Sequence, residues 1–150
     1  MIEITNEKID EQAVLDSVKD QDSGACVLFV GTTRRMTGAK ETVTLKYEAY
    51  REMAIEQMTS LSEKAAAKWP LKHCSIVHRL GQVDIGETSI AVAVGSPHRI
   101  DAFEAASWLM DELKAIVPIW KQEHWTDGSS EWVHPTETDG SKAETSESKS

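Results

Sequence analysis

The chain has 150 residues, 40% of them hydrophobic, and a formal net charge of −9 at pH 7. This length suits one domain with its own core. The negative charge argues against general nucleic-acid binding, which needs a basic surface. No apolar run approaches the ~18 residues of a membrane span, so we expect no membrane association. The polar, acidic N-terminus has the pattern of neither a signal nor a transit peptide, and we expect a cytoplasmic protein.

The two cysteines, Cys26 and Cys74, both fall within apolar runs of strand length. The sequence therefore favours a reduced, buried pair over a disulfide. No spacing of cysteine and histidine is typical of a metal site, and we expect neither a metal nor a cofactor.

Periodicity predicts the elements of the first half of the chain. They are a strand at 2–5, a helix at 7–19, a strand at 24–31, a polar loop at 32–41 and a strand at 42–50. Because the run at 24–31 is continuously apolar, we expect a central strand that is buried on both faces. The last strand alternates, and its inner face is predicted to carry Val43, Leu45, Tyr47 and Ala49.

Periodicity also predicts the elements of the second half of the chain. Its predicted elements are helix 51–69, strand 73–81, a hairpin-length connection at 82–87, strand 88–95, helix 97–117, strand 118–124 and strand 130–134. Ser96-Pro97 is a favourable helix entry, and Pro118 stops the helix. The inner stripe of helix 51–69 is predicted to be Met53, Ile55, Met58, Leu61, Ala65 and Trp69. That of helix 97–117 is predicted to be Ile100, Phe103, Ser107, Met110, Leu113 and Val117.

This order contains strand–helix–strand–strand–helix–strand, which is typical of a split βαβ arrangement. We therefore predict an α+β domain over residues 1–135, with a mainly antiparallel sheet, helices packed on one face, and extra C-terminal strands. From Thr136 onward the chain has no large apolar residue, so we expect a disordered acidic tail at 136–150.

Two pairs of cations stand at the ends of predicted strands. Arg34 and Arg35 follow strand 24–31, where a solvated loop is the preferred interpretation and bidentate phosphate binding is the alternative. His98 and Arg99 lie at a strand-to-helix junction, where backbone N–H groups face any anion. A capping histidine with a surface arginine is an equally good interpretation of that pair. The similar dipeptide His78-Arg79 lies within a strand, which favours a core histidine and a salt-bridged arginine.

Two lysines flank Pro118. Lys114 in the last helical turn is explained by the helix dipole alone, which favours a cation there by about 0.3–1 kcal/mol. If strand 118–124 folds back beside the helix, however, Lys121 approaches Lys114. Converging lysines indicate an anionic ligand, a depressed lysine pKa, or both. No carboxylate dyad, serine-nucleophile motif or phosphate loop competes, so the residues alone predict a cationic pocket built from Arg34, His98, Arg99, Lys114 and Lys121.

Segments containing these cations resemble a known family. They are GACVLFVGTTRR at 24–35, LKYEAYREMA at 45–54, KWPL at 68–71, VHRLGQVDIGETSIAVAV at 77–94, SPHRIDAFEA at 96–105, LK at 113–114 and PIWKQE at 118–123. In this order and spacing, over residues 24–134, the sequence resembles the large catalytic subunit of molybdopterin synthase.

The resemblance implies a sulfurtransferase that converts cyclic pyranopterin monophosphate (precursor Z) into the dithiolene of molybdopterin, in molybdenum cofactor biosynthesis. The sulfur arrives as a thiocarboxylate on the C-terminal Gly-Gly of a small ubiquitin-like subunit, whose tail threads into the pocket. Two large subunits form a homodimer core with one small subunit at each end, a heterotetramer. The implied substrate-binding residues are Thr32, Thr33, Arg34, His98, Arg99, Lys114, Lys121, Gln122 and Glu123.

Lys114 and Lys121 are the expected catalytic residues. We expect Lys114 to be the main acid/base or covalent group, and Lys121 to stabilise the carboxylate end. The sequence departs from the family at Thr32, where some relatives carry lysine, and at Arg35, where the family usually has another residue. A non-catalytic dimeric module that senses an anionic metabolite is the alternative function, and it would use the same pocket without needing Lys114.

Overall fold

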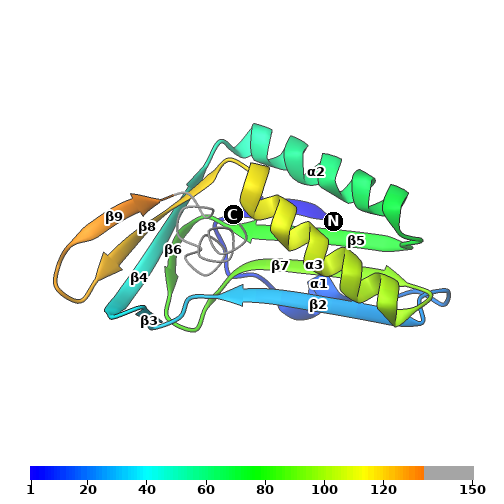
Figure 1. Ribbon diagram of the computed structural model, residues 1–150, viewed down its shortest axis with the longest axis horizontal. Coiled ribbons are helices and arrows are strands. Elements are labelled where there is room, and N and C mark those ends of the chain that lie inside the picture. The colour runs from blue at the N-terminus through cyan, green and yellow to red at the C-terminus, as the bar shows by residue number, and fades with distance from the viewer. Residues whose placement is uncertain (134–150) are drawn as a thin grey trace, which may run out of the picture.

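Two adjoining β-sheets and three helices make up residues 1–133, the part of the chain that the structure, a computed structural model, describes (Figure 1). The first sheet has the strand order β1 (Ile2–Thr5), β5 (His73–Arg79), β7 (Thr88–Ser96) and β2 (Ala25–Thr32). β1 pairs in parallel with β5, and the other pairings are antiparallel.

The second sheet is antiparallel throughout. Its strands are β3 (Met36–Thr37), β4 (Lys40–Ala49), β8 (Ile119–Trp125) and β9 (Ser130–Val133), with β6 (Gly81–Asp84) also paired to β4. β4 lies between β8 and β6, which join it on opposite edges. The predicted α+β class with a mainly antiparallel sheet is confirmed, and the strands are divided between two sheets.

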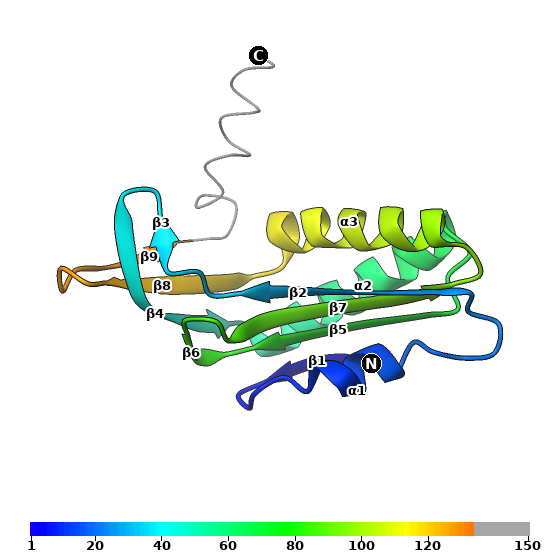
Figure 2. The same cartoon turned by 90° about the horizontal axis from the view of Figure 1, so that it is seen from below.

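The helices cover both faces of the first sheet. The long helices α2 (Arg51–Lys68) and α3 (Arg99–Ile116) lie on one face, as predicted, and the short helix α1 (Glu11–Asp16) lies on the other (Figure 2). The reason is β7, in which every residue is buried. A strand that is apolar on both sides needs cover on both sides. Val14 of α1, with Val18, provides it by packing against the face that α2 and α3 leave free.

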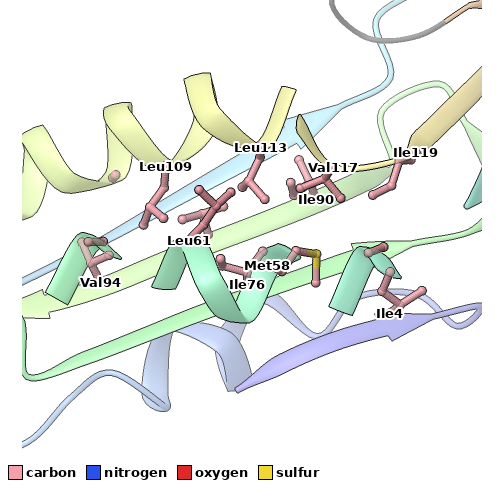
Figure 3. Packing of buried hydrophobic residues seen from close by; sticks show 14 of the residues in the cluster. Ile4, Met58, Leu61, Ile76, Ile90, Val94, Leu109, Leu113, Val117 and Ile119 are labelled. Carbon is pink, nitrogen blue, oxygen red and sulfur yellow. The ribbon is translucent and has the colours of Figure 1, made fainter. Parts of the chain in front are cut away.

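The main core lies between the first sheet and the two long helices. Met58 and Leu61 of α2, Leu109 of α3 and Ile76 of β5 are fully buried there (Figure 3). Burying one such side chain stabilises the fold by about 1.5–3 kcal/mol.

The predicted inner stripe of α3 is wrong in its first half. Ile100 and Phe103 are 62% and 61% exposed, and Ala102, Ala105 and Leu109 are buried instead. Small alanines allow the helix to lie close to the sheet, and two large apolar side chains then point outward. Met53 of α2 is likewise 52% exposed, while its neighbour Ala54 is buried. The second half of the α3 stripe, Leu113 and Val117, is buried as predicted.

The predicted central strand at 24–31 is also wrong, because β2 is an edge strand of the first sheet. Its side chains are mostly half-buried, and Phe29 is 40% exposed. α3 runs alongside it (Figures 1 and 2). β2 and α3 are neighbours, and both carry exposed large apolar side chains, Phe29 on β2 and Ile100 and Phe103 on α3; we call these three residues the β2–α3 surface.

Three smaller differences have local causes. Val43 points outward because a bulge between Thr42 and Thr44 shifts the alternation of β4, and Thr42 is buried in its place. The connection at 82–87 contains part of β6, which leaves the first sheet to pair with β4. The loop at 32–41 contains the short strand β3. The predicted tail at 136–150 lies outside the described residues.

Candidate functional site

A cavity of about 770 Å³ lies where the two sheets and the C-terminal end of α3 meet. Its wall includes Arg34 after β2, Lys114 in the last turn of α3 and Lys121 in β8. Pro118 ends α3, and the chain then returns along β4 in antiparallel register, with Lys121 opposite Tyr47. The predicted approach of Lys121 to Lys114 follows from this return, and both lysines line the same cavity.

Lys121 occupies a half-buried position in the wall of the cavity. Its side chain is 20% exposed, and its Nζ lies 3.4 Å from Oε1 of Glu123. Burial lowers the pKa of Lys121, the Glu123 carboxylate opposes that change, and the charges of Arg34 and Lys114 lower the pKa further. Lys121 therefore loses its proton at a lower pH than an ordinary lysine.

Glu123 is the buried carboxylate of the cavity, with 3% of the residue exposed. Oε1 pairs with Lys121, and within residues 1–133 no hydrogen-bond partner reaches Oε2. A buried carboxylate oxygen without a partner is costly in free energy. Glu123 therefore holds a negative charge inside the cavity wall, beside Lys121.

Tyr47 and His78 contribute neutral polar groups to the same cavity. Their rings meet edge to face, with centroids 5.0 Å apart. Burial lowers the pKa of His78 to about 4, so its ring is uncharged at neutral pH. The predicted core histidine is confirmed, and so is the salt-bridged arginine, since Arg79 Nη1 lies 3.4 Å from Oε1 of Glu87. Sequence reasoning missed that His78 also faces the cavity.

His98 and Arg99 lie at the opposite end of α3. They line a separate hollow with Gly24, Pro97 and Ile100. Fifteen residues at 1.5 Å rise per residue put Arg99 about 22 Å from Lys114 along the helix. The expectation that five cationic groups of one chain surround one pocket is therefore wrong: Arg34, Lys114 and Lys121 meet, and His98 and Arg99 do not join them.

The other residues discussed in the sequence analysis lie partly inside and partly outside the cavity. Thr32 lines the cavity, but Thr33 does not. Thr33 is buried, and its backbone N–H donates to the Glu87 carbonyl at 3.0 Å. Gln122 lies on the other face of β8 from its neighbours, where it donates to Ser130. Arg35 is exposed, 3.9 Å from Glu41.

Cys26 and Cys74 are free thiols, and each is half-buried. Burial raises the pKa of the Cys74 thiol, which makes it a weak nucleophile, and neither cysteine lines the cavity. No group of three or more histidine, cysteine or carboxylate side chains in residues 1–133 is arranged to hold a metal ion. None of the helices in that range combines the length and apolar character that a membrane span requires.

Comparison with known proteins identifies relatives over most of the chain. The profile of the family described as "MoaE protein" matches residues 4–116. The molybdopterin synthase catalytic subunit of Bacillus subtilis is 40% identical over 131 residues, 87% of this chain and 83% of that protein. Molybdopterin synthase catalytic subunit 1 of Aedes aegypti is 43% identical over 145 residues, 95% of this chain and 94% of that protein.

A solved structure agrees with these sequences. The crystal structure of molybdopterin synthase from Staphylococcus aureus matches with a TM-score of 0.83 and 38% identity, over 87% of this chain and 94% of that one. The MoaE protein from Burkholderia ambifaria matches with a TM-score of 0.78 and 29% identity, over 97% of each chain. The chain therefore belongs to the MoaE family, the catalytic subunits of molybdopterin synthase.

Proposed function

We propose that the chain transfers sulfur from the thiocarboxylated C-terminus of a small ubiquitin-like subunit to cyclic pyranopterin monophosphate, which yields the molybdopterin dithiolene. One observation carries this proposal. Arg34, Lys114 and Lys121 gather around one cavity in a protein whose net charge is −9. The rest of the surface repels anions on average, so such a gathering favours an anionic guest.

The cavity suits both reactants. The pterin substrate carries a cyclic phosphate, and the Arg34 guanidinium is suited to bidentate phosphate binding. The partner's Gly-Gly tail is narrow enough to enter a cavity and ends in a thiocarboxylate, a second anion. The partner brings the sulfur, which agrees with the absence of both cysteines from the cavity wall.

The two lysines receive different roles in this proposal. Lys114 is the main acid/base or covalent group, and Lys121 stabilises the oxyanion that develops on the partner's terminal carbon. Burial lowers the pKa of Lys121, and the charges of Arg34 and Lys114 lower it further, which supports a proton-transfer capacity in that lysine as well. Glu123 holds Lys121 in place from 3.4 Å.

A second copy of the chain completes the site. The β2–α3 surface has a free strand edge and three exposed large apolar side chains, Phe29, Ile100 and Phe103. An uncovered apolar edge strand is a template for pairing with another chain. A two-fold axis there sets the two β2 strands antiparallel, with the start of one beside the end of the other.

This arrangement gives His98 and Arg99 a place in the site, although they do not line the cavity of their own chain. β2 has eight residues and spans about 26 Å, close to the ~22 Å that separates Arg99 from Lys114. Antiparallel pairing therefore carries the partner's Arg99 and the partner's His98 toward the end of β2, where Arg34 and the cavity lie. The implied substrate-binding set is then assembled from two protomers, in a homodimer that binds one small subunit at each end.

Reconstitution tests the proposed function. The purified chain is mixed with precursor Z and a thiocarboxylated small subunit, and the dithiolene product is measured after conversion to a stable fluorescent derivative. We expect product only when all three components are present. If the chain binds precursor Z but forms no product with an authentic thiocarboxylated partner, the metabolite-sensor alternative replaces this proposal. We place the reaction in the cytoplasm.

A further inference from the structure

His78 is a cavity residue to which the proposed sulfur transfer gives no role. It lies on β5, opposite Ile90 of β7, and its side chain shares the sheet face of Ile76 and the long helices. The residue is 7% exposed and lines the cavity. A polar ring in that position has to be matched by hydrogen-bond partners.

The proton of the His78 ring is fixed by the backbone. Nδ1 lies 2.9 Å from the carbonyl oxygen of Arg79. A carbonyl oxygen only accepts, so Nδ1 carries the hydrogen and donates it. Since burial lowers the pKa of His78 to about 4, the ring does not take a second proton at neutral pH. Nε2 is therefore an unprotonated acceptor.

Two contacts keep the ring in this orientation. The edge-to-face contact with Tyr47, at an interplanar angle of 70°, holds one side of the ring. Turning the ring over would exchange Nδ1 for a carbon and break the bond to the Arg79 carbonyl. The hydrogen bond to the Arg79 carbonyl on β5 and the ring contact with Tyr47 on β4 together fix the position of the acceptor Nε2.

Glu123 provides a negative charge on the wall of the same cavity. Its Oε2 has no hydrogen-bond partner within residues 1–133, and only 3% of the residue is exposed. The cavity wall therefore combines the cations of Arg34, Lys114 and Lys121 with the acceptor Nε2 of His78 and the carboxylate of Glu123. A ligand that matches this wall carries both an anionic group and hydrogen-bond donors.

We propose that Nε2 of His78 accepts a hydrogen bond from an N–H group of the pterin, while the cations hold the phosphate. This proposal rests on the proposed function and adds an orientation to it. A reduced pterin carries ring N–H groups and an amino group, all of them donors, and one of these donors faces Nε2 of His78. His78 is then a specificity residue that rejects analogues lacking those donors.

Nitrogen NMR of the wild-type dimer tests the proposal directly. In protein labelled with ¹⁵N-histidine, His78→Gln identifies the His78 signals. We expect a neutral ring protonated on Nδ1 between pH 6 and 8, and an upfield shift of the Nε2 signal when precursor Z is added. A ring protonated on Nε2, or an Nε2 signal that does not move when precursor Z binds, would overturn the proposal.

A matched pair of variants separates binding from structure. In His78→Asn the amide still donates near the Nδ1 position but has no acceptor near Nε2, and we expect the Kd for precursor Z to rise about tenfold. His78→Gln places a carbonyl oxygen near Nε2, and we expect the Kd to stay within about threefold of wild type. A merely structural role predicts no advantage of glutamine over asparagine.

The outcomes also separate the two proposals. If wild-type protein does not bind precursor Z, the proposed function and this inference fall together. If wild type binds precursor Z and makes product, but His78→Asn binds it as tightly as wild type, only the role of His78 is refuted. Should His78→Asn fail to fold, the NMR titration of the wild-type protein still decides the question.

Discussion

A mixed-dimer experiment tests whether each site draws its cations from two protomers. Lys114→Ala removes a group at one end of α3, and Arg99→Ala removes a group about 22 Å away at the other end. We expect each variant alone to have little activity. In a mixed dimer, one site loses both groups, whereas the other keeps Lys114 from one chain and the partner's Arg99.

The activity that the mixture should recover follows from the number of intact sites. Equal amounts of two chains that exchange freely give about half mixed dimers, and each mixed dimer has one intact site out of two. We therefore expect about a quarter of the wild-type activity. The two variants are mixed, allowed to exchange subunits in mild urea, dialysed, and assayed for dithiolene formation.

A second mixture is the matched control. Lys114 and Lys121 line the cavity of the same chain, so a dimer of Lys114→Ala with Lys121→Ala has one defect in each site. We expect no recovery from it. Equal recovery in both mixtures, or none in either, would refute the shared site and require the partner's Arg99 to act elsewhere.

Two further predictions concern the fold. The pKa of His78 falls from 6.5 to about 4 on folding, so between pH 6.5 and pH 4 the unfolded chain binds a proton more readily than the folded chain. The free energy of unfolding should therefore fall by up to about 3 kcal/mol between pH 7 and pH 4. Guanidinium titrations at several pH values measure this free energy. If the free energy of unfolding of His78→Phe falls as steeply with decreasing pH as that of wild type, the reasoning is contradicted. Leu109→Ala, at a fully buried position, should destabilise the chain by about 2–5 kcal/mol. Ile100→Ala, 62% exposed, should weaken the dimer, but at concentrations at which the dimer dissociates it should leave the urea midpoint of the monomer nearly unchanged. Equal losses of stability in the two variants would show that the buried face of α3 is assigned wrongly.

Local signals were sufficient to predict the convergence of the two lysines. Pro118 forces the helix to stop, and the strand after it is long enough to return past the last helical turn, so Lys121 approaches Lys114. The alternation of β8 also explains why Glu123 faces the cavity and Gln122 does not. Strand periodicity alone therefore separates Glu123 from Gln122, whereas the family resemblance assigned the whole segment 121–123 to the site.

Other features depend on contacts that a sequence pattern does not contain. Ile100 and Phe103 fit an inner stripe as well as Ala102 and Leu109 do, and only the close approach of α3 to the sheet decides between them. The apolar run of β2 predicts burial, which in one chain is incomplete because the strand lies at an edge. Both errors point to the same surface, which a second protomer covers in our proposal.

His78 shows a different limit. A histidine inside an apolar strand is most often a core residue, and here it is one. That it also lines the cavity depends on the contact of its ring with Tyr47 of β4, which no local pattern encodes. The hydrogen bond to the Arg79 carbonyl, which fixes the tautomer, is likewise visible only in three dimensions.

Single-turnover sulfur transfer by Lys114→Ala at saturating precursor Z is the most direct measurement of the central claim. If Lys114 moves a proton or forms a covalent bond during the reaction, the rate should fall at least about 100-fold while the Kd for precursor Z changes much less. Lys121→Ala, assayed in parallel, reports the separate contribution of the oxyanion stabiliser. A Lys114→Ala rate near that of wild type would contradict the account.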